Sequence, residues 1–499
     1  MAQVTEERRP RTREGRPEDP HAQAPVAPAP AAAPGSRTRR LLARHWPFLL
    51  ILGAAAGLRV AAWLAVHPAW WILGDGIGYL DAALHPHPDW WRPSGYSLLL
   101  LLPLRKAHDL SLVTGVQHAM GLAAAVATYA ALLRLGLPRW GAALAAIPVL
   151  FDGYVIATEQ MVASEALFGL LVAAGLVVLL WRMADPPLLA VAAAGLLLAL
   201  SAVTRIVGLP LIAVAALVLL LPRPRWSRLA ALGVAFALPV GIYAVWFSHT
   251  YGQLNLTASS GIFLYGRTTQ FVDCGRVHFS SEQLHRLCPP EPIGARNETW
   301  YVFDVASPVS RAGLGSTAAN DLAGRFAREA IAAQPGDYAA LSWHGVVETF
   351  AWDQSSLLND MLFENDQVLP DRARATGIAY QRRDPGPYRR PQLVRALGAY
   401  QGIVHVPGTA LLLALMVAAA GLVFGRDPEG RGLRAAVVLT GGAAAVLLLV
   451  PALTAIVQPR YLVPAIPALC LAAAVGVELL ANRWRPAAGQ LKGRPTPPR

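Results

Sequence analysis

Long apolar runs separated by short basic segments set the hydrophobic pattern of the chain. A membrane-spanning helix needs about 20 mainly apolar residues. Ten runs of roughly this length occur, at 46–66, 111–133, 141–157, 161–181, 188–204, 206–221, 229–248, 400–424, 435–457 and 461–481. The pattern predicts an all-α polytopic membrane protein with about ten transmembrane helices.

Arginines orient these runs in a consistent way. They precede the first run and follow each even-numbered run, as Arg134, Arg182, Arg228, Arg426 and Arg483 illustrate. Short cytoplasmic loops carry the excess of Lys and Arg in membrane proteins. We therefore expect both termini in the cytoplasm and the intervening loops on the outer face.

Two outer segments and two tails complete the predicted organisation. The stretch 249–398 is polar and aromatic and contains no spanning run, which predicts one extracytoplasmic domain of mixed secondary structure with amphipathic helices at 317–333 and 337–350. The N-terminal residues are rich in Pro, Ala, Arg and Glu, which predicts a disordered tail. The expected order is a cytoplasmic tail (1–40), an N-terminal transmembrane catalytic module (41–248) with its first outer loop (67–110), the extracytoplasmic domain (249–398), the last helices (399–482) and a cytoplasmic tail (483–499).

The composition is typical of a membrane protein. Of the 499 residues, 55% are hydrophobic and 15% are charged, and the formal net charge is +12. The arginines stand between apolar runs instead of on one basic domain, which argues against nucleic-acid binding. Abundant Ala, Gly, Pro and Arg, with Lys106 and Lys492 as the only lysines, are typical of a G+C-rich bacterial genome. We expect a bacterial plasma membrane protein.

The first carboxylate with a possible chemical role is Asp75. It lies in an aromatic and glycine-rich stretch just beyond the first run. A carboxylate near a dry boundary can act as a general base on a sugar or lipid hydroxyl. The alternative is that Asp75 caps a short interfacial helix, since Asp is a favoured N-cap residue.

Further charged residues map to the same outer boundary. Arg92 could bind a phosphate or stack on the neighbouring tryptophans. Glu159 and Glu165 stand where the third and fourth runs meet, and Glu165 could instead be a structural partner of an arginine such as Arg205. Arg205 and Arg460 could each hold a phosphate or reach a lipid headgroup. A single wet, charged cavity would explain all six residues together, with Tyr79 and Tyr461 beside it.

Two cysteines share the outer stretch, whereas Cys470 lies in an apolar run. Cys274, His278, His285 and Cys288 could be zinc ligands. Because an oxidising compartment favours disulfides, a Cys274–Cys288 bond is the preferred prediction, with the histidines as ordinary surface residues.

Taken together, the motifs resemble the GT-C membrane glycosyltransferases of the protein O-mannosyltransferase and aminoarabinose-transferase type. The matching stretches, in order, are GDGIGY (74–79), RPSGYSLLLLLP (92–103), SEALFGLLVAAGLVVL (164–179), TRIVGLPLIAVAALVLLL (204–221) and QPRYLVPAIPAL (458–469). The family often has an adjacent acidic pair in the first of these, whereas here Gly76 follows Asp75. A divalent metal at this loop is therefore possible but not indicated, and no other cofactor is.

The resemblance implies a GT-C-like fold and a polyprenyl-phosphate sugar donor. Asp75 would deprotonate an acceptor hydroxyl that attacks the anomeric carbon with inversion, while Arg205 and Arg460 would stabilise the departing phosphate. The acceptor could be a polysaccharide, a protein or a lipid. Two other functions are possible: a glycolipid transporter or flippase, and a non-catalytic GT-C-like protein of cell-envelope assembly.

Overall fold

The computed structural model describes residues 34–220, 225–353, 363, 368–428, 431–455 and 458–484. The chain divides into one unit that ends at Trp46 and a second unit, Pro47–Arg499. Of the first unit, the described part is the beginning of helix α1 (Pro34–Ala65). This helix begins inside the segment 1–40, which the sequence predicted to be disordered, because its Ala, Leu and Arg residues favour a helix. The remaining description concerns the second unit.

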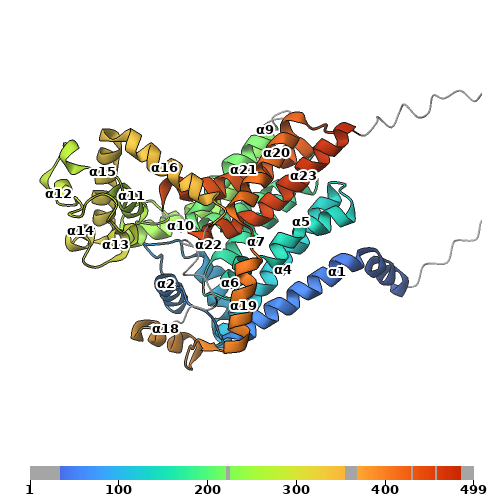
Figure 1. Ribbon diagram of the computed structural model, residues 1–499, viewed down its shortest axis with the longest axis horizontal. Coiled ribbons are helices and arrows are strands. Elements are labelled where there is room, and N and C mark those ends of the chain that lie inside the picture. The colour runs from blue at the N-terminus through green and yellow to red at the C-terminus, as the bar shows by residue number, and fades with distance from the viewer. Residues whose placement is uncertain are drawn as a thin grey trace, which may run out of the picture. The chain divides into compact units, whose positions relative to one another are not determined.

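Apolar helices form the body of this unit (Figure 1). By length and composition, five helices can cross a membrane, and up to seven if each of two bent pairs is one span. The long helices are α1, α4 (Leu110–Arg134), α10 (Trp226–Tyr251), α21 (Leu433–Thr454) and α23 (Ile466–Trp484), the last together with α22 (Pro459–Leu462) and η6 (Val463–Ala465). These apolar helices make the chain a multi-pass membrane protein.

The other predicted runs correspond to bent or shorter helices. The two bent pairs are α5 (Arg139–Phe151) with α6 (Gly153–Glu159), at 54°, and α19 (Pro391–Ile403) with α20 (Gly408–Phe424), at 45°. The shorter helices are α7 (Glu165–Leu180), α8 (Leu188–Thr204) and α9 (Leu211–Leu220), which follows η3 (Ile206–Gly208). Each of the ten predicted runs thus overlaps a helix, while five to seven meet the requirement for a full span.

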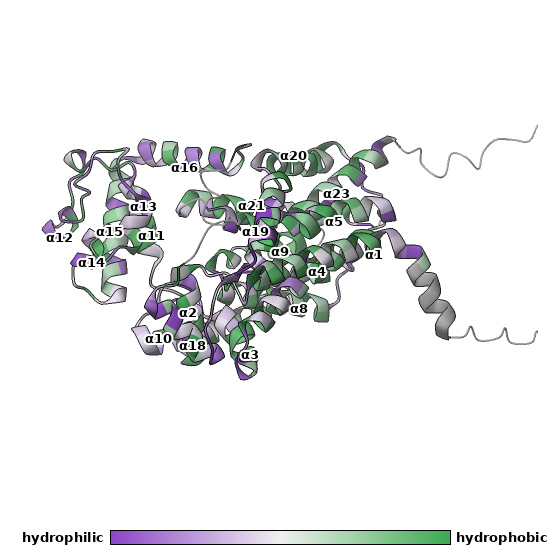
Figure 2. Ribbon diagram, turned by 60° about the horizontal axis from the view of Figure 1, so that its bottom comes forward, coloured by the Kyte–Doolittle hydropathy of each residue, from purple (hydrophilic) through white to green (hydrophobic). Residues whose placement is uncertain are grey.

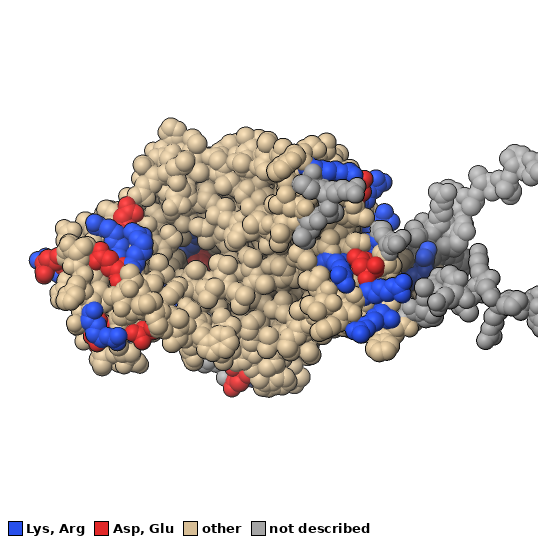
Figure 3. Space-filling view, turned by 90° about the horizontal axis from the view of Figure 1, so that it is seen from above, with Lys and Arg blue, Asp and Glu red and all other residues tan. Residues whose placement is uncertain are grey.

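Charged residues gather away from the apolar middle of the molecule. Figure 3 shows one face on which charged side chains lie toward two ends and leave a broad, nearly uncharged area between them. Among the loops between the apolar helices, Arg134 donates to the carbonyl of Trp181, Arg228 pairs with Asp185, and Arg431 donates to the carbonyl of Leu135, just after Arg134. The segments that the arginine pattern placed on one side of the membrane therefore lie together.

The loop after α1 folds into its own small core. It contains β1 (Val66–His67), α2 (Leu73–Leu84), the π-helical turn η1 (Ser97–Leu101), α3 (Leu102–Leu104) and η2 (Arg105–Ala107). Helix α18 (Asp371–Gln381) packs against α2, and β2 (Tyr388–Arg389) pairs antiparallel with β1. Buried Trp71, Tyr96 and Tyr380 belong to this core. Helix α18 and strand β2 therefore pack with the first loop.

A second extramembrane group has a separate core (left in Figure 1). It consists of α11 (Ser260–Thr269), η4 (Cys274–Arg276), α12 (Glu282–His285), α13 (Glu298–Phe303), α14 (Pro308–Arg311), α15 (Ser316–Ala333) and α16 (Pro335–Thr349). Figure 2 shows polar and apolar residues mixed along these helices, whereas α4, α5 and α23 are mostly apolar. The helices predicted at 317–333 and 337–350 are confirmed as α15 and α16.

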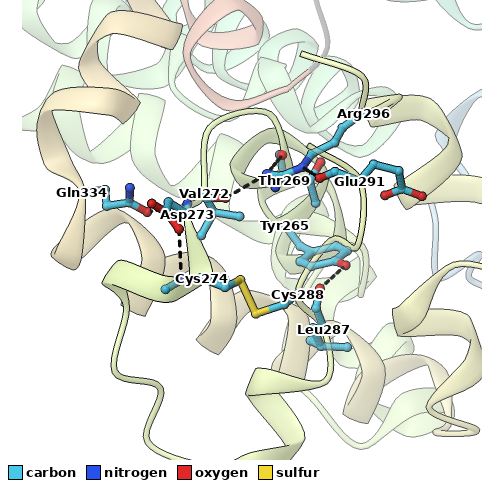
Figure 4. The surroundings of a disulfide bond; sticks show 11 residues. Tyr265, Thr269, Val272, Asp273, Cys274, Leu287, Cys288, Glu291, Arg296 and Gln334 are labelled. Carbon is cyan, nitrogen blue, oxygen red and sulfur yellow. Dashed lines mark hydrogen bonds between the residues drawn. A yellow bond between two sulfur atoms is a disulfide. The ribbon is translucent and has the colours of Figure 1, made fainter. Parts of the chain in front are cut away.

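The expectation of mixed secondary structure in 249–398 is wrong for its described residues. Apart from the two-residue strand β2, the regular elements there are helices. The alternation of apolar and polar residues that a half-buried strand needs is missing, while α15 carries an apolar face at helical spacing. The predicted Cys274–Cys288 disulfide is confirmed (Figure 4). Beside it, the Tyr265 hydroxyl donates to the carbonyl of Leu287 at 2.7 Å.

Candidate functional site

A cavity of about 520 Å³ opens where the first loop, the apolar helices and helices α11 and α13 meet. Six of the residues singled out in the sequence line it: Asp75, Tyr79, Arg92, Arg205, Arg460 and Tyr461. Much of the remaining wall is apolar, with Phe168 from α7, Val207, Leu209 and Pro210 from the turn between α8 and α9, and Val450 and Pro451 from α21. The cavity therefore joins a compact charged group to an apolar surface.

Asp75 is the centre of the charged group. It lies in the first turn of α2, whose N-cap is Ile72, so the alternative that Asp75 caps this helix is wrong. One carboxylate oxygen lies 2.5 Å from the Arg460 guanidinium, and the other lies 3.0 Å from that of Arg92. Segments 385 residues apart in the sequence thus meet at one carboxylate.

Arg205 and Glu165 form the second half of the group. Glu165 begins α7 and is buried, and its Oε1 lies 2.5 Å from Arg205 and 3.9 Å from Arg460. Arg205 also donates to the Ser164 hydroxyl at 3.1 Å. Glu165 thus pairs with Arg205, the partner that the structural interpretation named, and it does not itself line the cavity.

Two tyrosines support the arginines with their ring faces. The guanidinium carbons of Arg205 and Arg460 lie 5.0 Å and 5.1 Å from the centre of the Tyr461 ring. Arg92 lies 5.3 Å above the ring of Tyr79, so it stacks on this tyrosine and not on the adjacent tryptophans. A cation over an aromatic face is stabilised by the ring quadrupole while its N–H groups stay available. The arginines are thus held without using all of their donors.

A close backbone approach fixes the segment that carries Arg92. A Cβ atom at Gly95 would lie 2.3 Å from the carbonyl oxygen of Val203, so glycine is needed for this contact. The backbone N–H of the preceding Ser94 donates to the Tyr243 hydroxyl of α10 at 2.9 Å. The RPSGYS motif therefore docks the first loop onto the end of α8, next to Arg205.

Glu159 lies apart from the cavity, which corrects the expectation that it would join the other charges. It ends α6 and is buried, with Arg59 of α1 at 2.8 Å and the His118 ring of α4 at 2.8 Å. A Cβ atom at Gly121 would fall 1.7 Å from the carboxylate, so glycine makes the room for it. Because α6 is bent from α5 by 54°, the side chain at its end turns into the helix bundle.

Arg59 and His118, the two partners of Glu159, are ionisable residues that the sequence pattern did not single out. Both stand inside runs that were counted simply as apolar, although an ionisable side chain in a spanning helix is costly unless it is paired. That rule was the available signal. Next to His118, Gln117 donates to the carbonyls of Glu159 and Met161 and accepts from the Tyr96 hydroxyl. The Tyr96 ring centre lies 4.8 Å from that of Tyr79, which lines the cavity.

The charges shape the acid–base properties of the extramembrane groups. Burial alone would raise the pKa of Asp75, but the charges of Arg460 and Arg92 outweigh it and hold this pKa well below its usual range. Burial and the charge of Asp75 raise the pKa of Tyr79 to about 12. Asp75 is therefore ionised and Tyr79 protonated near neutral pH.

The described residues contain no group of three His, Cys, Asp or Glu side chains that could hold a metal ion. Because Cys274 and Cys288 are joined to each other, their thiolates are not available as zinc ligands with His278 and His285. Asp75, which lines the cavity, and Glu165, which does not, are both engaged by arginines.

No protein-family model and no curated protein matches the sequence. Among solved structures, the chain is similar to the archaeal oligosaccharyltransferase AglB from Archaeoglobus fulgidus, solved with an inhibitory peptide and a dolichol-phosphate. The identity is 14% and the TM-score 0.42, with 88% of this chain and 50% of that chain covered, so the present chain spans half of AglB. It is also similar to ArnT from Cupriavidus metallidurans in the apo state, at 13% identity and a TM-score of 0.35, covering 87% and 77% of the two chains.

Proposed function

We propose that this protein is a glycosyltransferase that moves a sugar from a polyprenyl-phosphate donor to an acceptor hydroxyl at the outer face of the membrane. The observation that carries the proposal is the charge of the cavity. Arg92, Arg205 and Arg460 stand against the two carboxylates Asp75 and Glu165, which leaves one positive charge in excess. A sugar phosphodiester of a lipid carries one negative charge and would neutralise it.

The shape of the cavity suits such an amphiphilic donor. Its volume of about 520 Å³ lies within the range of small-molecule sites, roughly 300–1,000 Å³. The wall beside Arg205 consists of Val207, Leu209 and Pro210, and the opposite helix α21 adds Val450 and Pro451. A polyprenyl chain could follow this apolar surface into the bilayer while its phosphate stays with Arg205 and Arg460.

The chemistry assigned to the site is a direct displacement. Asp75 accepts the proton of the acceptor hydroxyl, whose oxygen then forms a bond to the anomeric carbon of the donor sugar. The bond from that carbon to the phosphate oxygen breaks, and polyprenyl phosphate leaves with the electron pair. Attack opposite the leaving group inverts the configuration at the anomeric carbon. Arg205 and Arg460 stabilise the second negative charge that develops on the phosphate.

Donor binding would also make Asp75 a stronger base for accepting the proton of the acceptor hydroxyl. With its arginine partners engaged, Asp75 has a depressed pKa and is a weak base. A phosphate that draws Arg460 toward itself would weaken the 2.5 Å contact between Arg460 and Asp75. The pKa of Asp75 would then rise toward the range of a useful base. Glu165 would keep Arg205 in place throughout, and Tyr79 and Tyr461 would support the arginines.

The sidedness of the protein is part of the proposal. We place the cavity and α11–α16 outside the plasma membrane of a bacterium, with both termini in the cytoplasm, because arginine-rich loops are typically cytoplasmic. The support is that Arg134, Arg228 and Arg431 contact one another's neighbouring loops, so the arginine-rich loops lie together.

A donor panel tests the function. Purified protein in lipid nanodiscs is incubated with decaprenyl- and undecaprenyl-phosphate sugars labelled in the sugar, together with a membrane extract as the source of acceptor. We expect the label to move into a new product with release of polyprenyl phosphate. Donor translocation in sealed vesicles without a labelled product would instead indicate a flippase. Donor binding without either event, across the whole panel, would indicate a non-catalytic envelope protein.

A further inference from the structure

Three aromatic rings gather on the extramembrane side of the cavity, and the chemistry described so far uses none of them. We call Trp91, Phe263 and Phe303 the aromatic platform. The Trp91 ring centre lies 5.3 Å from that of Phe303 and 6.0 Å from that of Phe263, and the two phenylalanine centres lie 5.8 Å apart. All three residues line the cavity.

Packing accounts for part of this arrangement but not for all of it. Trp91 and Phe263 are half-buried against the core of the outer helices. Phe303, at the end of α13, keeps 47% of its surface exposed although it stands in a ring cluster. A large aromatic side chain that is exposed toward a cavity, with two further rings behind it, is a ready surface for a ligand.

The platform is joined to the reacting centre through the backbone. Trp91 directly precedes Arg92, whose guanidinium lies 3.0 Å from Asp75. The position of Trp91 is set by two hydrogen bonds, from its N–H to Asp89 at 2.7 Å and from the Ser259 hydroxyl to its carbonyl at 2.7 Å. The series of contacts therefore runs from Arg205 through Glu165 to Arg460, then to Asp75 and Arg92, and Trp91 of the platform is the next residue in the chain.

This order separates the platform from the donor lipid. Its three rings come from the first loop, α11 and α13, and none of these segments is a candidate membrane span. The proposed phosphate site at Arg205 and Arg460 lies at the other end of this series of contacts, and the apolar residues Val207, Leu209 and Pro210 that follow Arg205 in the chain also line the cavity. Asp75 stands between the two ends, so the group that meets it from the platform side is the acceptor.

The chemistry of the platform matches a sugar ring. The C–H face of a pyranose or furanose is apolar and its hydrogens carry a partial positive charge, which suits the negative face of an aromatic ring. Ring hydroxyls need polar partners at the edge, and Thr257 and the exposed Ser260 line the cavity next to the platform. We infer that the acceptor is a glycan whose terminal sugar stacks on Trp91, Phe263 and Phe303. This inference rests on the proposed function.

Binding of defined saccharides tests the inference. The full-length protein in nanodiscs is titrated with tetrasaccharides of mannose, glucose, galactose or arabinose, with binding followed by saturation-transfer NMR. We expect at least one tetrasaccharide to bind, Phe303→Ala to weaken it about tenfold, and Phe303→Tyr to restore it, because loss of one stacked ring is worth roughly that factor. Trp343→Ala removes a ring that is 68% exposed on α16, away from the cavity, and should change nothing.

Several outcomes would overturn the inference. These are the absence of binding by every tetrasaccharide, equal binding by the wild type and Phe303→Ala, and Phe303-dependent binding of a Ser- and Thr-rich peptide in place of the saccharides, which would indicate a protein acceptor. Decaprenyl phosphate is titrated into the same samples and should bind Phe303→Ala as well as the wild type. Failure of decaprenyl phosphate to bind the wild type would count against the donor site and the proposed function, independently of the saccharide result.

Discussion

Arg460 pairs with Asp75 and is also the proposed ligand of the donor phosphate. It holds Asp75 in the free protein and, in the proposed complex, the donor phosphate. Arg460→Gln should raise the Kd for decaprenyl phosphate about tenfold or more, since a charge-assisted hydrogen bond to phosphate is worth about 1.5–3 kcal/mol. Arg460→Lys should recover part of this, because a point charge remains without the fork.

The matched control is Arg286→Gln, which removes an arginine from an exposed pair with Glu282 on the outer helices. Its Kd for decaprenyl phosphate should equal that of the wild type. Equal affinity of Arg460→Gln and Arg286→Gln for the lipid phosphate would rule out Arg460 as a phosphate ligand.

The pH dependence of transfer should report the release of Asp75 from its arginines. In the free protein the pKa of Asp75 is held well below its usual range, so the base form persists as the pH falls. Donor phosphate would offset the arginine charge and raise this pKa. Because kcat/KM reports the free enzyme and kcat the complex, the acidic limb of kcat should lie at higher pH than that of kcat/KM. Coinciding limbs would show that the donor leaves Asp75 unchanged.

Much of the charged group could be predicted from the sequence, because topology alone puts Asp75, Arg92, Arg205 and Arg460 at one boundary. The sequence could not predict which arginine pairs with which carboxylate, since Asp75 and Arg460 are 385 residues apart. Glu159 also stands at that boundary in the chain, yet its side chain turns inward to Arg59. The direction of one side chain after a helix bend depends on tertiary packing, which the pattern of residues does not contain.

At the scale of elements, the buried pair of Arg59 and Glu159 ties α1 to α6. Glu159→Gln keeps the volume of the side chain but leaves the Arg59 guanidinium without its counter-charge. Breaking one partner of a buried ion pair costs about 3–5 kcal/mol. The midpoint of thermal unfolding in detergent should therefore fall by several degrees.

Glu282→Gln is the control for this change, because it removes a carboxylate from the exposed pair with Arg286. Its midpoint should match that of the wild type. If Glu159→Gln unfolded at the same temperature as the control, the buried ion pair would contribute nothing to the stability of the fold.

The apolar runs in the sequence predicted the helices but not the places where two of these helices are broken. The run 400–424 joins the end of α19 to α20, which begins at Gly408 directly after Pro407, where a helix cannot continue from the preceding turn. The run 141–157 hides the break at Asp152, whose side chain caps α6. The β1–β2 pair joins two-residue strands more than 300 positions apart, and strands so short have no periodicity to detect.

At the scale of the whole molecule, the proposed orientation can be tested by labelling single cysteines in intact cells. In a Cys470→Ala background, Arg325→Cys on α15 should react with a membrane-impermeant maleimide from outside. Arg182→Cys should react after the cells are permeabilised, because it lies at the opposite, arginine-rich end. Both native positions are exposed, so access to the reagent depends on the side of the membrane. The reverse labelling pattern would invert the topology.

Sugar transfer at Asp75 is the claim on which the whole account depends, and single-turnover transfer in Asp75→Asn tests it most directly. Donor is bound to saturation on the wild type and the variant, acceptor extract is added, and release of polyprenyl phosphate is followed. We predict release by the wild type and a loss of about 100-fold or more in the variant, as expected for a missing general base, with the donor still bound. Release by Asp75→Asn at the wild-type rate would contradict the assignment.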